Sequence, residues 1–254
     1  MTIKPNQVGI DLGSRFVKIA TVHNDCEPEL HRYDTVEFYK QFIIRNQDAV
    51  CIDIDKLAIP NNYSITATGY GRNLMSFANA EIISEIKAHF RGVARTSKET
   101  DFVLIDIGGQ DSKVIWAKDG YIEDFVMNDK CAASTGRFAE NACAVLGYTI
   151  DELGQMTDSP VSLSTTCAVF CESEIISLIA SGVDIKRIGA GINLSMAKRL
   201  APLIKTFSAP KIFASGGTAK NKAMLYFMSE LIKKDIVTIS NSQYNGALGC
   251  LECI

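Results

Sequence analysis

Two stretches of this sequence carry the same residue types at the same spacing. Residues 11–18 read Asp-Leu-Gly-Ser-Arg-Phe-Val-Lys and residues 106–113 read Asp-Ile-Gly-Gly-Gln-Asp-Ser-Lys, so the second aspartate comes 95 residues after the first (106 minus 11). A carboxylate at the end of a strand can orient waters of a bound Mg²⁺, and the amides of a glycine turn can approach phosphate oxygens. One copy alone is more typical of a strand that simply ends in a turn. Two copies in register favour a pair of hairpins that clamp a triphosphate and its metal.

A third stretch adds a place for the nucleoside. Residues 211–219 read Lys-Ile-Phe-Ala-Ser-Gly-Gly-Thr-Ala, which predicts a strand that runs into a double glycine before a helix. Backbone without side chains at Gly216 and Gly217 can lie flat against a nucleoside. The chain contains neither a Gly-x-x-x-x-Gly-Lys-Ser/Thr loop nor a Gly-x-Gly-x-x-Gly fingerprint, so P-loop and Rossmann nucleotide sites lack their main support.

Two cysteines stand just ahead of predicted helices. Cys131 follows Asn-Asp-Lys, and Cys167 follows Ser-Thr-Thr. A helix N-terminus lowers the pKa of a thiol and stabilises an anionic cluster. An iron–sulfur cluster commonly binds four thiolates, so two subunits could supply the set. Spacing alone favours buried core thiols instead, because neither cysteine belongs to a Cys-x-x-Cys pair.

The remaining cysteines and the histidines show no spacing typical of a metal site. The Cys-x-x-Cys at residues 250–253 has no second pair to complete a site and is interpreted as structural. We expect the three histidines to lie on surfaces or loops. The cysteines without ligand-like spacing and the histidines are Cys26, Cys51, Cys143, His23, His31 and His89.

The elements that must position these residues form a repeated pattern. Each Asp-x-Gly stretch predicts a buried strand, a polar glycine turn and a second strand, and Lys-Asp-Gly at residues 118–120 predicts a turn into a third. A duplicated three-stranded meander followed by helices is therefore expected, with a boundary in the polar stretch 92–100. The predicted helices are 80–90, 138–146, 172–180, 188–204 and 223–232, and further strands are 64–68, 212–215 and 236–239.

Composition limits the class of protein. The 254 residues are 47% hydrophobic and 22% charged, with a net charge of −3, as in an ordinary globular protein with a real core. No basic block suits nucleic acid, and no leader or membrane-spanning run is evident. We expect a cytoplasmic protein that binds neither nucleic acid nor membrane.

The three phosphate and nucleoside motifs, in this order around a duplicated meander, resemble the superfamily of sugar kinases, actin and heat-shock chaperone ATPases. The resemblance implies an α/β fold with two ribonuclease-H-like domains around an ATP cleft. The expected domains are 1–95 and 96–254. The second carries the cluster cysteines, and the last segment of the chain can pack back on the first domain.

Longer motifs narrow the family. Residues 9–14, 67–72, 106–111, 128–133 and 243–249 resemble the activator ATPases of 2-hydroxyacyl-CoA dehydratases and the ATPase subunits of benzoyl-CoA reductases. The resemblance implies a homodimer that holds one [4Fe-4S] cluster, binds ATP, ADP and Mg²⁺, and couples ATP hydrolysis to electron transfer at low potential. It also implies an iron–sulfur dehydratase or reductase as partner, and ferredoxin or flavodoxin as electron donor.

The same resemblance assigns residues to roles. Asp11, Asp106 and Gln110 are the expected catalytic residues, and Cys131 and Cys167 the expected cluster ligands. Cys171 stands where a small residue such as Ala is expected, and is either a packed bystander or a competing ligand. The expected nucleotide-binding residues are Gly13, Ser14, Arg15, Phe16, Val17, Lys18, Gly108, Gly109, Gly216, Gly217 and Gln243.

Two other functions remain open for the same fold. A small-molecule kinase would need a substrate base beside the nucleotide and no cluster. A nucleotide switch of the actin or chaperone type would need neither a substrate base nor a cluster. ATPase activity coupled to electron transfer is the leading expectation, and a cluster with visible absorbance is the feature that separates it from both.

Overall fold

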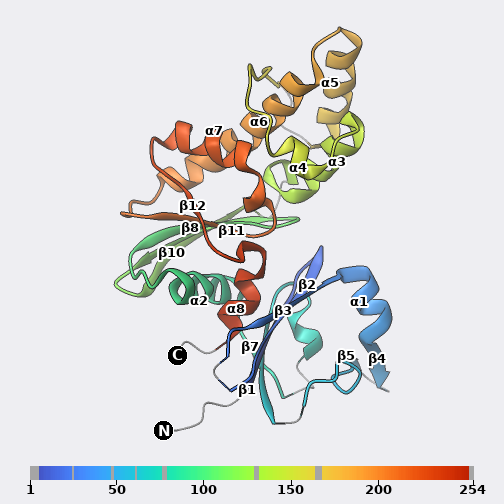
Figure 1. Cartoon of the computed structure of the whole chain (residues 1–254), viewed down its shortest axis with the longest axis vertical. Coiled ribbons are helices and arrows are strands. Elements are labelled where there is room, and N and C mark those ends of the chain that lie inside the picture. The colour runs from blue at the N-terminus through green and yellow to red at the C-terminus, as the bar shows by residue number, and fades with distance from the viewer. Residues whose placement is uncertain are drawn as a thin grey trace. The chain divides into compact units, whose positions relative to one another are not determined.

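The computed structural model forms two compact units (Figure 1). Unit 1 comprises the described parts of Met1–Lys98 and Tyr244–Ile254, and unit 2 comprises those of Glu99–Gln243. Unit 1 is therefore completed by the end of the chain. The structure describes residues 6–24, 26–46, 49–60, 62–75, 79–128, 132–163 and 168–251.

A five-stranded sheet in the order β3-β2-β1-β6-β7 forms the centre of unit 1. Its strands are β1 (Asn6–Leu12), β2 (Phe16–Val22), β3 (Glu29–Asp34), β6 (Tyr63–Thr68) and β7 (Glu81–Ile82). A separate hairpin pairs β4 (Ile43–Asn46) with β5 (Ala49–Ile52). The helices are α1 (Thr35–Phe42), α2 (Glu85–Ser97), α8 (Asn245–Cys250) and the 3-10 turn η1 (Arg72–Met75), and η4 (Ser242–Tyr244) precedes α8.

Strand β1 divides its side chains between two faces of the sheet. Val8, Ile10 and Leu12 are buried in a core that also contains Phe38 of α1. The alternate positions face α8, because a Cβ at Gly9 would overlap the backbone of Ala247. The short helix α8 packs closely on β1 and on α2. Alternation along one strand thus places Asp11 on the face that α8 covers.

Unit 2 repeats the sheet order as β10-β9-β8-β11-β12. Its strands are β8 (Phe102–Ile107), β9 (Ser112–Lys118), β10 (Tyr121–Asn128), β11 (Ile212–Ser215) and β12 (Val237–Thr238). Its helices are α3 (Gly136–Leu146), α4 (Ile150–Leu153), α5 (Ala168–Ala180), α6 (Ile185–Lys205) and α7 (Lys222–Ile232), with 3-10 turns η2 (Ala132–Ser134) and η3 (Thr218–Lys220).

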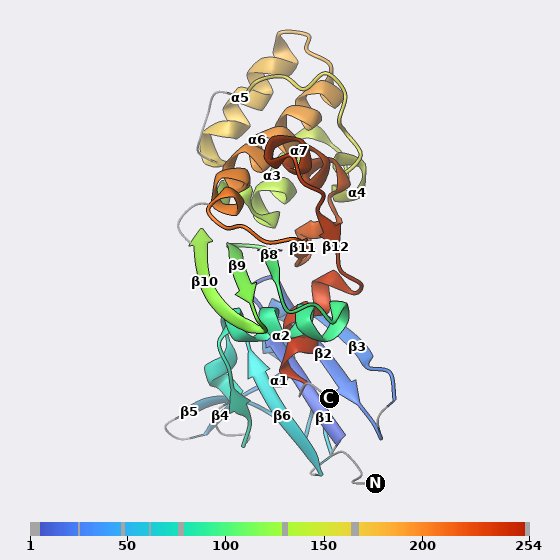
Figure 2. The same cartoon turned by 90° about the vertical axis from the view of Figure 1, so that its left-hand side faces the viewer.

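The helices of unit 2 gather on one side of its sheet (Figure 2). Val103, Ile105 and Ile107 of β8 are buried in a core shared with α3, α5, α6 and α7. A buried amide pair braces this layer, since Asn221 Nδ2 donates to Asn193 Oδ1 at 2.8 Å. The bond thus joins α6 to Asn221, the residue that caps α7.

The predicted meander is confirmed in both sheets, including the turn at 118–120, where Asp119 and Gly120 have φ of 52° and 80°. The predicted limits of the helix at 80–90 are wrong. Helix α2 begins after Ser84, whose hydroxyl accepts a hydrogen bond from Lys87 N, and ends at Lys98 in the left-handed region. Most of the stretch expected as a boundary is therefore helical.

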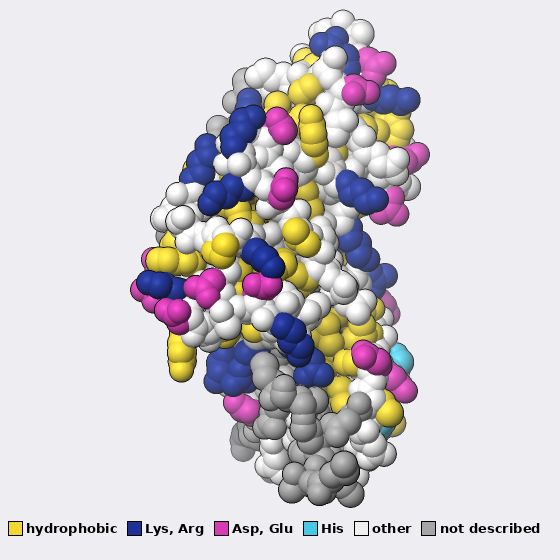
Figure 3. Space-filling view, turned by 60° about the vertical axis from the view of Figure 1, so that its left-hand side comes forward, with side chains coloured by type: hydrophobic (Ala, Val, Ile, Leu, Met, Phe, Trp, Pro, Cys, Tyr) yellow, Lys and Arg dark blue, Asp and Glu magenta, His cyan; other side chains and the backbone are white. Residues whose placement is uncertain are grey.

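Charged side chains of both signs, with apolar side chains among them, cover the face in Figure 3. Among the helices that the structure describes, none is both long enough and apolar enough to cross a membrane.

Candidate functional site

In unit 1 the lysine and the aspartate of the first repeat form an ion pair. Asp11 of β1 is paired in register with Lys18 of β2, and Lys18 Nζ donates to Asp11 Oδ2 at 2.8 Å. The two side chains are 17% and 6% exposed, with lysine the more accessible. The pair therefore combines a nearly buried carboxylate with a cation that solvent can reach.

The turn that joins β1 to β2 is shaped around a glycine. A Cβ at Gly13 would lie 2.8 Å from Phe16 O and 2.9 Å from Lys18 Nζ, both too close for a side chain. Thr35 Oγ1 donates to Gly13 O at 2.8 Å, which ties the turn to the start of α1. The ring of Phe16 lies 4.6 Å from the guanidinium of Arg15. The turn thus keeps backbone amides and a guanidinium together.

Three further residues predicted to bind nucleotide, in the turn and at the start of β2, differ in their exposure. Ser14 is half-buried, and its hydroxyl belongs to the same turn. Arg15 forms an ion pair with Asp34. Partial desolvation raises the pKa of Asp34, but hydrogen bonds from the Glu37 amide and from Arg15 outweigh desolvation, so the pKa of this carboxyl lies below its usual value. The side chain of Val17 is fully buried in the core, so its contact with a ligand would come from the backbone.

Gly246 of α8 lies between the carboxylate of Asp11 and the side chain of His89 in α2. A Cβ at Gly246 would lie 2.9 Å from Asp11 Oδ2 and 3.2 Å from His89 Nε2. Asn245 Nδ2 donates to His89 O at 2.9 Å and lies 3.2 Å from His89 Nδ1. His89 is 7% exposed, so the expectation that it lies on a surface or loop is wrong. It packs inward because α8 covers this face of α2.

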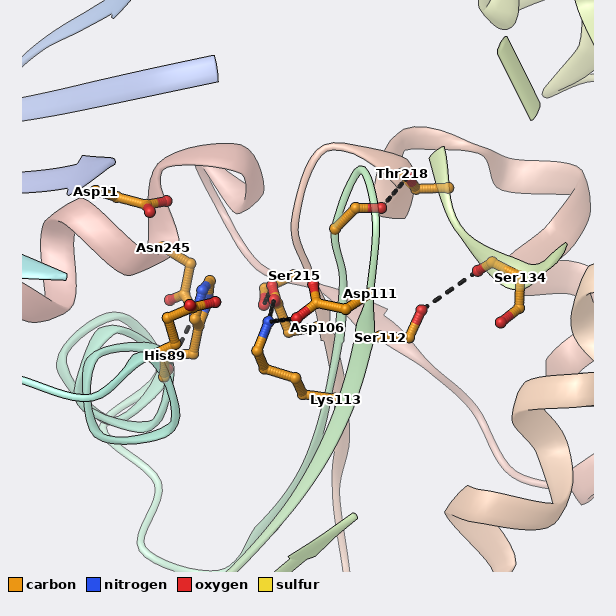
Figure 4. Close-up of polar contacts among 12 residues, drawn as sticks. Asp11, His89, Asp106, Asp111, Ser112, Lys113, Ser134, Ser215, Thr218 and Asn245 are labelled. Atoms are coloured by element: carbon orange, nitrogen blue, oxygen red, sulfur yellow. Dashed lines mark hydrogen bonds and ion pairs between the residues drawn. The ribbon is translucent and has the colours of Figure 1, made fainter. Parts of the chain in front are cut away.

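In unit 2 the second repeat forms a cluster around a more deeply buried lysine (Figure 4). Lys113 is 2% exposed, and its Nζ lies 2.6 Å from Asp111 Oδ2 and 4.0 Å from Asp106 Oδ2. Ser215 Oγ donates to Asp106 Oδ1 at 2.7 Å. Asp106 thus has a hydroxyl donor and a nearby ammonium group.

The glycine turn after β8 is joined to the start of α3. Gly136 N donates to Gly108 O and Arg137 N donates to Gly109 O, each at 2.9 Å. The neighbouring Gln110 is exposed. Because the first amides of α3 bond the carbonyls of the turn, a shift of the turn would act directly on that helix.

The double glycine after β11 makes a tight turn beside β8. Gly216 has φ of 88°, and a Cβ there would overlap the carbonyl oxygen of Ile107. Gly216 N donates to Ser242 O at 2.9 Å, and the adjacent Gln243 is half-buried. Gly217 is exposed, and a Cβ added there would meet no atom within 4 Å. An open backbone surface of this kind suits a flat ring.

Cys131 and Cys167 lie outside the described residues. Cys171 is 2% exposed and packs in the core of unit 2. Burial, with smaller effects from Glu152 and Glu140, raises the pKa of the Cys143 thiol to about 11. Within the described ranges, no group of three or more His, Cys, Asp or Glu side chains could hold a metal ion.

Several residues of these clusters were not predicted. Asp111 and Ser215 stood inside the quoted motifs without a role, and the His89–Asn245 pair joins segments 156 residues apart. A common signal was present at the ends of β6 and β11, where Thr68-Gly69 and Ser215-Gly216 each place a hydroxyl residue before a glycine.

The sequence model of the BadF/BadG/BcrA/BcrD ATPase family matches residues 58–253. The chain belongs to this family. The activator of lactoyl-CoA dehydratase from Anaerotignum propionicum is 41% identical over 194 residues, which cover 72% of each chain. The activator of the 2-hydroxyisocaproyl-CoA dehydratase from Clostridium difficile, solved with bound ADPNP, has a TM-score of 0.82 at 32% identity and covers 96% of this chain and 92% of its own.

A more distant structure shows the fold alone. A ROK family glucokinase from Streptomyces griseus has a TM-score of 0.57 at 10% identity and covers 96% of this chain and 97% of its own. This likeness and the equivalent strand order of the two sheets confirm the predicted fold of the sugar kinase and actin superfamily. The sequence match confirms the predicted family.

Proposed function

We propose that this member of the BadF/BadG/BcrA/BcrD ATPase family is an ATP-hydrolysing activator that transfers electrons at low potential from an iron–sulfur cluster to a partner enzyme. The partner would be a 2-hydroxyacyl-CoA dehydratase or a related iron–sulfur reductase, and ferredoxin or flavodoxin would supply the electrons. The observation that carries the proposal is the pair of Lys–Asp hairpins in a chain 41% identical to a dehydratase activator.

The donor set of the two hairpins fits ATP and Mg²⁺. Each hairpin presents a glycine turn next to an aspartate and a lysine, and a relative of the same fold was solved with an ATP analogue. Lysine attracts phosphate oxygens, and aspartate orients metal-bound water. We assign Asp11, Asp106 and Gln110 to catalysis. The nucleotide contacts are assigned to residues 13–18 at the turn and the start of β2, and to Gly108, Gly109, Gly216, Gly217 and Gln243.

The hydrogen bonds between the turn after β8 and the start of α3 support coupling of nucleotide to the cluster. A phosphate that draws Gly108 or Gly109 toward itself also moves the carbonyls that bond Gly136 N and Arg137 N. Because α3 packs against α5, a shift of one helix changes its packing on the other. Changes in the nucleotide would thereby reach both helices.

Cys131 and Cys167 are the proposed cluster ligands, two from each subunit of a homodimer. In the sequence, Cys167 directly precedes α5 and Cys131 stands five positions before α3, and these two helices pack against each other in unit 2. A bound [4Fe-4S] cluster would supply one-electron chemistry at low potential. The buried position of Cys171 supports its interpretation as a packed bystander.

Iron and acid-labile sulfide in the anaerobically purified protein test the proposal, together with visible absorbance. Cys131→Ser and Cys167→Ser should each lose the cluster from the whole dimer, because symmetry removes two ligands at once. Cys171→Ser is the matched control and should keep it. A colourless wild-type protein that hydrolyses ATP would favour the kinase or switch function instead.

The proposed coupling between the bound nucleotide and the cluster can be tested by the rate of iron removal. A ligand shifts a conformational equilibrium only by its differential affinity for the two states, so ATP and ADP must favour different arrangements of the cluster helices. Removal of iron by an external chelator should then differ in rate between the two nucleotide complexes. Equal rates, with both nucleotides shown to be bound, would mean that the cluster is not coupled to ATP.

A further inference from the structure

Three polar side chains form a row across neighbouring strands of unit 1. Asp11 of β1 is paired in register with Lys18 of β2 and with Thr68 of β6. Side chains paired in register on adjacent strands project from the same face of a sheet. Gly69 follows with φ of 94°, and a Cβ there would lie 2.7 Å from Asp11 Oδ1. The end of β6 is thus held against the carboxylate of Asp11.

Unit 2 contains the same row on the equivalent strands. Asp106 of β8 is paired in register with Lys113 of β9 and with Ser215 of β11. Gly216 follows Ser215 with φ of 88° and packs against Ile107, the residue after Asp106. The two sheets have equivalent strand orders. The duplication therefore extends beyond the hairpin to a hydroxyl on a third strand.

The two hydroxyls differ in their hydrogen bonding. Ser215 Oγ donates to Asp106 Oδ1 at 2.7 Å. Thr68 is fully buried, and its Oγ1 has no hydrogen-bond partner among the described residues. Buried hydroxyls are normally paired, because leaving one unpaired costs free energy. A second conformation in which Thr68 is paired would remove that cost.

The lysines of the two rows differ as well. The Lys18 side chain is 17% exposed, whereas that of Lys113 is 2% exposed. Lys18 can therefore leave Asp11 for a ligand, while Lys113 stays beside Asp111 and Asp106. If Lys18 leaves, Asp11 loses the hydrogen bond to its Oδ2 and needs another donor to hold its orientation.

We propose that Thr68 is a positioning residue for Asp11, equivalent to Ser215 for Asp106. Its hydroxyl donates to the Asp11 carboxylate when Lys18 turns to a phosphate of bound ATP, a change that needs rotation about the threonine χ1 bond. The inference rests on the proposed function, because it requires nucleotide at the hairpin of unit 1.

The test compares ATP hydrolysis by the purified full chain and its variants. Thr68→Val keeps the shape and removes the hydroxyl, so we expect kcat to fall about 10- to 100-fold while KM changes less than about twofold. The melting temperature should stay the same or rise. Thr68→Ser keeps the hydroxyl and should retain the wild-type kcat. Thr66→Val is the matched control, since Thr66 lies two residues earlier on the same face of β6, and it should hydrolyse ATP like the wild type.

Two outcomes overturn the inference in different ways. If Asp11→Asn loses hydrolysis but Thr68→Val keeps the wild-type kcat, the nucleotide site stands and Thr68 has no role in it. The same conclusion follows if Thr68→Val lowers the melting temperature and weakens ATP and ADP binding equally, as a packing defect would. If Asp11→Asn also hydrolyses ATP normally, the proposed function fails at this hairpin and the inference fails with it.

Discussion

The hairpins of unit 1 and unit 2 share a sequence pattern but place their charges in different surroundings. In unit 1, Lys18 pairs with Asp11 and remains partly exposed. In unit 2, Lys113 is almost fully buried between two carboxylates, Asp106 and Asp111. A charge that is out of contact with water must stay paired, whereas a partly exposed one can exchange partners at low cost. The comparison assigns a mobile cation to one hairpin and a fixed one to the other.

The largest expected effect is on catalysis, and it should be alike in the two hairpins. Asp11→Asn and Asp106→Asn should each lower ATP hydrolysis by about 100-fold or more, because both remove a charge that orients metal-bound water. Phosphate release measures this loss. Urea unfolding should separate the two variants: Asp106→Asn should lose about 2 kcal/mol, because its neighbours Lys113 and Ser215 are both buried. Asp11→Asn should lose less, because solvent reaches its partner Lys18. Wild-type hydrolysis in both variants would contradict the assigned site.

The glycines that end β6 and β11 should be equally intolerant of a side chain. Gly69→Ala and Gly216→Ala should each lower the free energy of unfolding by about 3 kcal/mol, because a positive φ and a backbone overlap add together. Gly182→Ala is the matched control, since Gly182 has φ of 78° but no atom within 4 Å of an added Cβ. It should lose only about 1 kcal/mol. A similar loss in all three variants would mean that φ alone matters and that neither turn is pressed against its neighbouring strand.

Substitution of the lysine should have different effects in the two hairpins. Lys113→Met should lower the free energy of unfolding by about 2 to 3 kcal/mol, because it removes the buried cation that lies beside Asp106 and Asp111. Lys18→Met should lower the free energy of unfolding by less than Lys113→Met, because solvent reaches Lys18, and it should also weaken ATP binding. Urea unfolding and nucleotide titration measure the two effects. Equal loss of stability in both variants would contradict the difference in burial.

The smallest effect concerns the third residue of the unit 2 row. Ser215→Ala removes the hydrogen bond to Asp106 Oδ1 and should lower the free energy of unfolding by about 1 kcal/mol. The unpaired hydroxyl of Thr68 gives no such loss in Thr68→Val. Both variants are measured by urea unfolding under one set of conditions, without nucleotide. A loss of the same size in Thr68→Val would show that its hydroxyl is paired in the free protein.

Features that depend on neighbouring residues were predicted well. The strand, glycine turn and strand of each hairpin follow from alternation and turn residues within about a dozen positions. The ends of helices were predicted less well, because α2 continues through the polar stretch at 92–97. Helical propensity and the left-handed cap at Lys98 outweighed the polarity of that stretch.

Residues that meet across the fold could not be predicted from spacing. The Asn245–His89 pair depends on the last helix of the chain packing on α2, and Ser215 reaches Asp106 from 109 residues away. Polarity alone suggested a surface position for His89. Its burial follows from the glycine-mediated approach of α8, where a Cβ at Gly249 would overlap the backbone of Ala88.

The sequence by itself determined the two Lys–Asp hairpins, the double glycine, the superfamily fold and the family, because repeated local patterns and long motifs carry that information. Only the tertiary structure decided which lysine is buried and which hydroxyl is paired. Burial and pairing depend on the layers that cover each face of a sheet, and two copies of one local pattern can be covered differently. Lys18 and Lys113 have the same place in the repeat, yet only the packing around each one decides whether its charge can move.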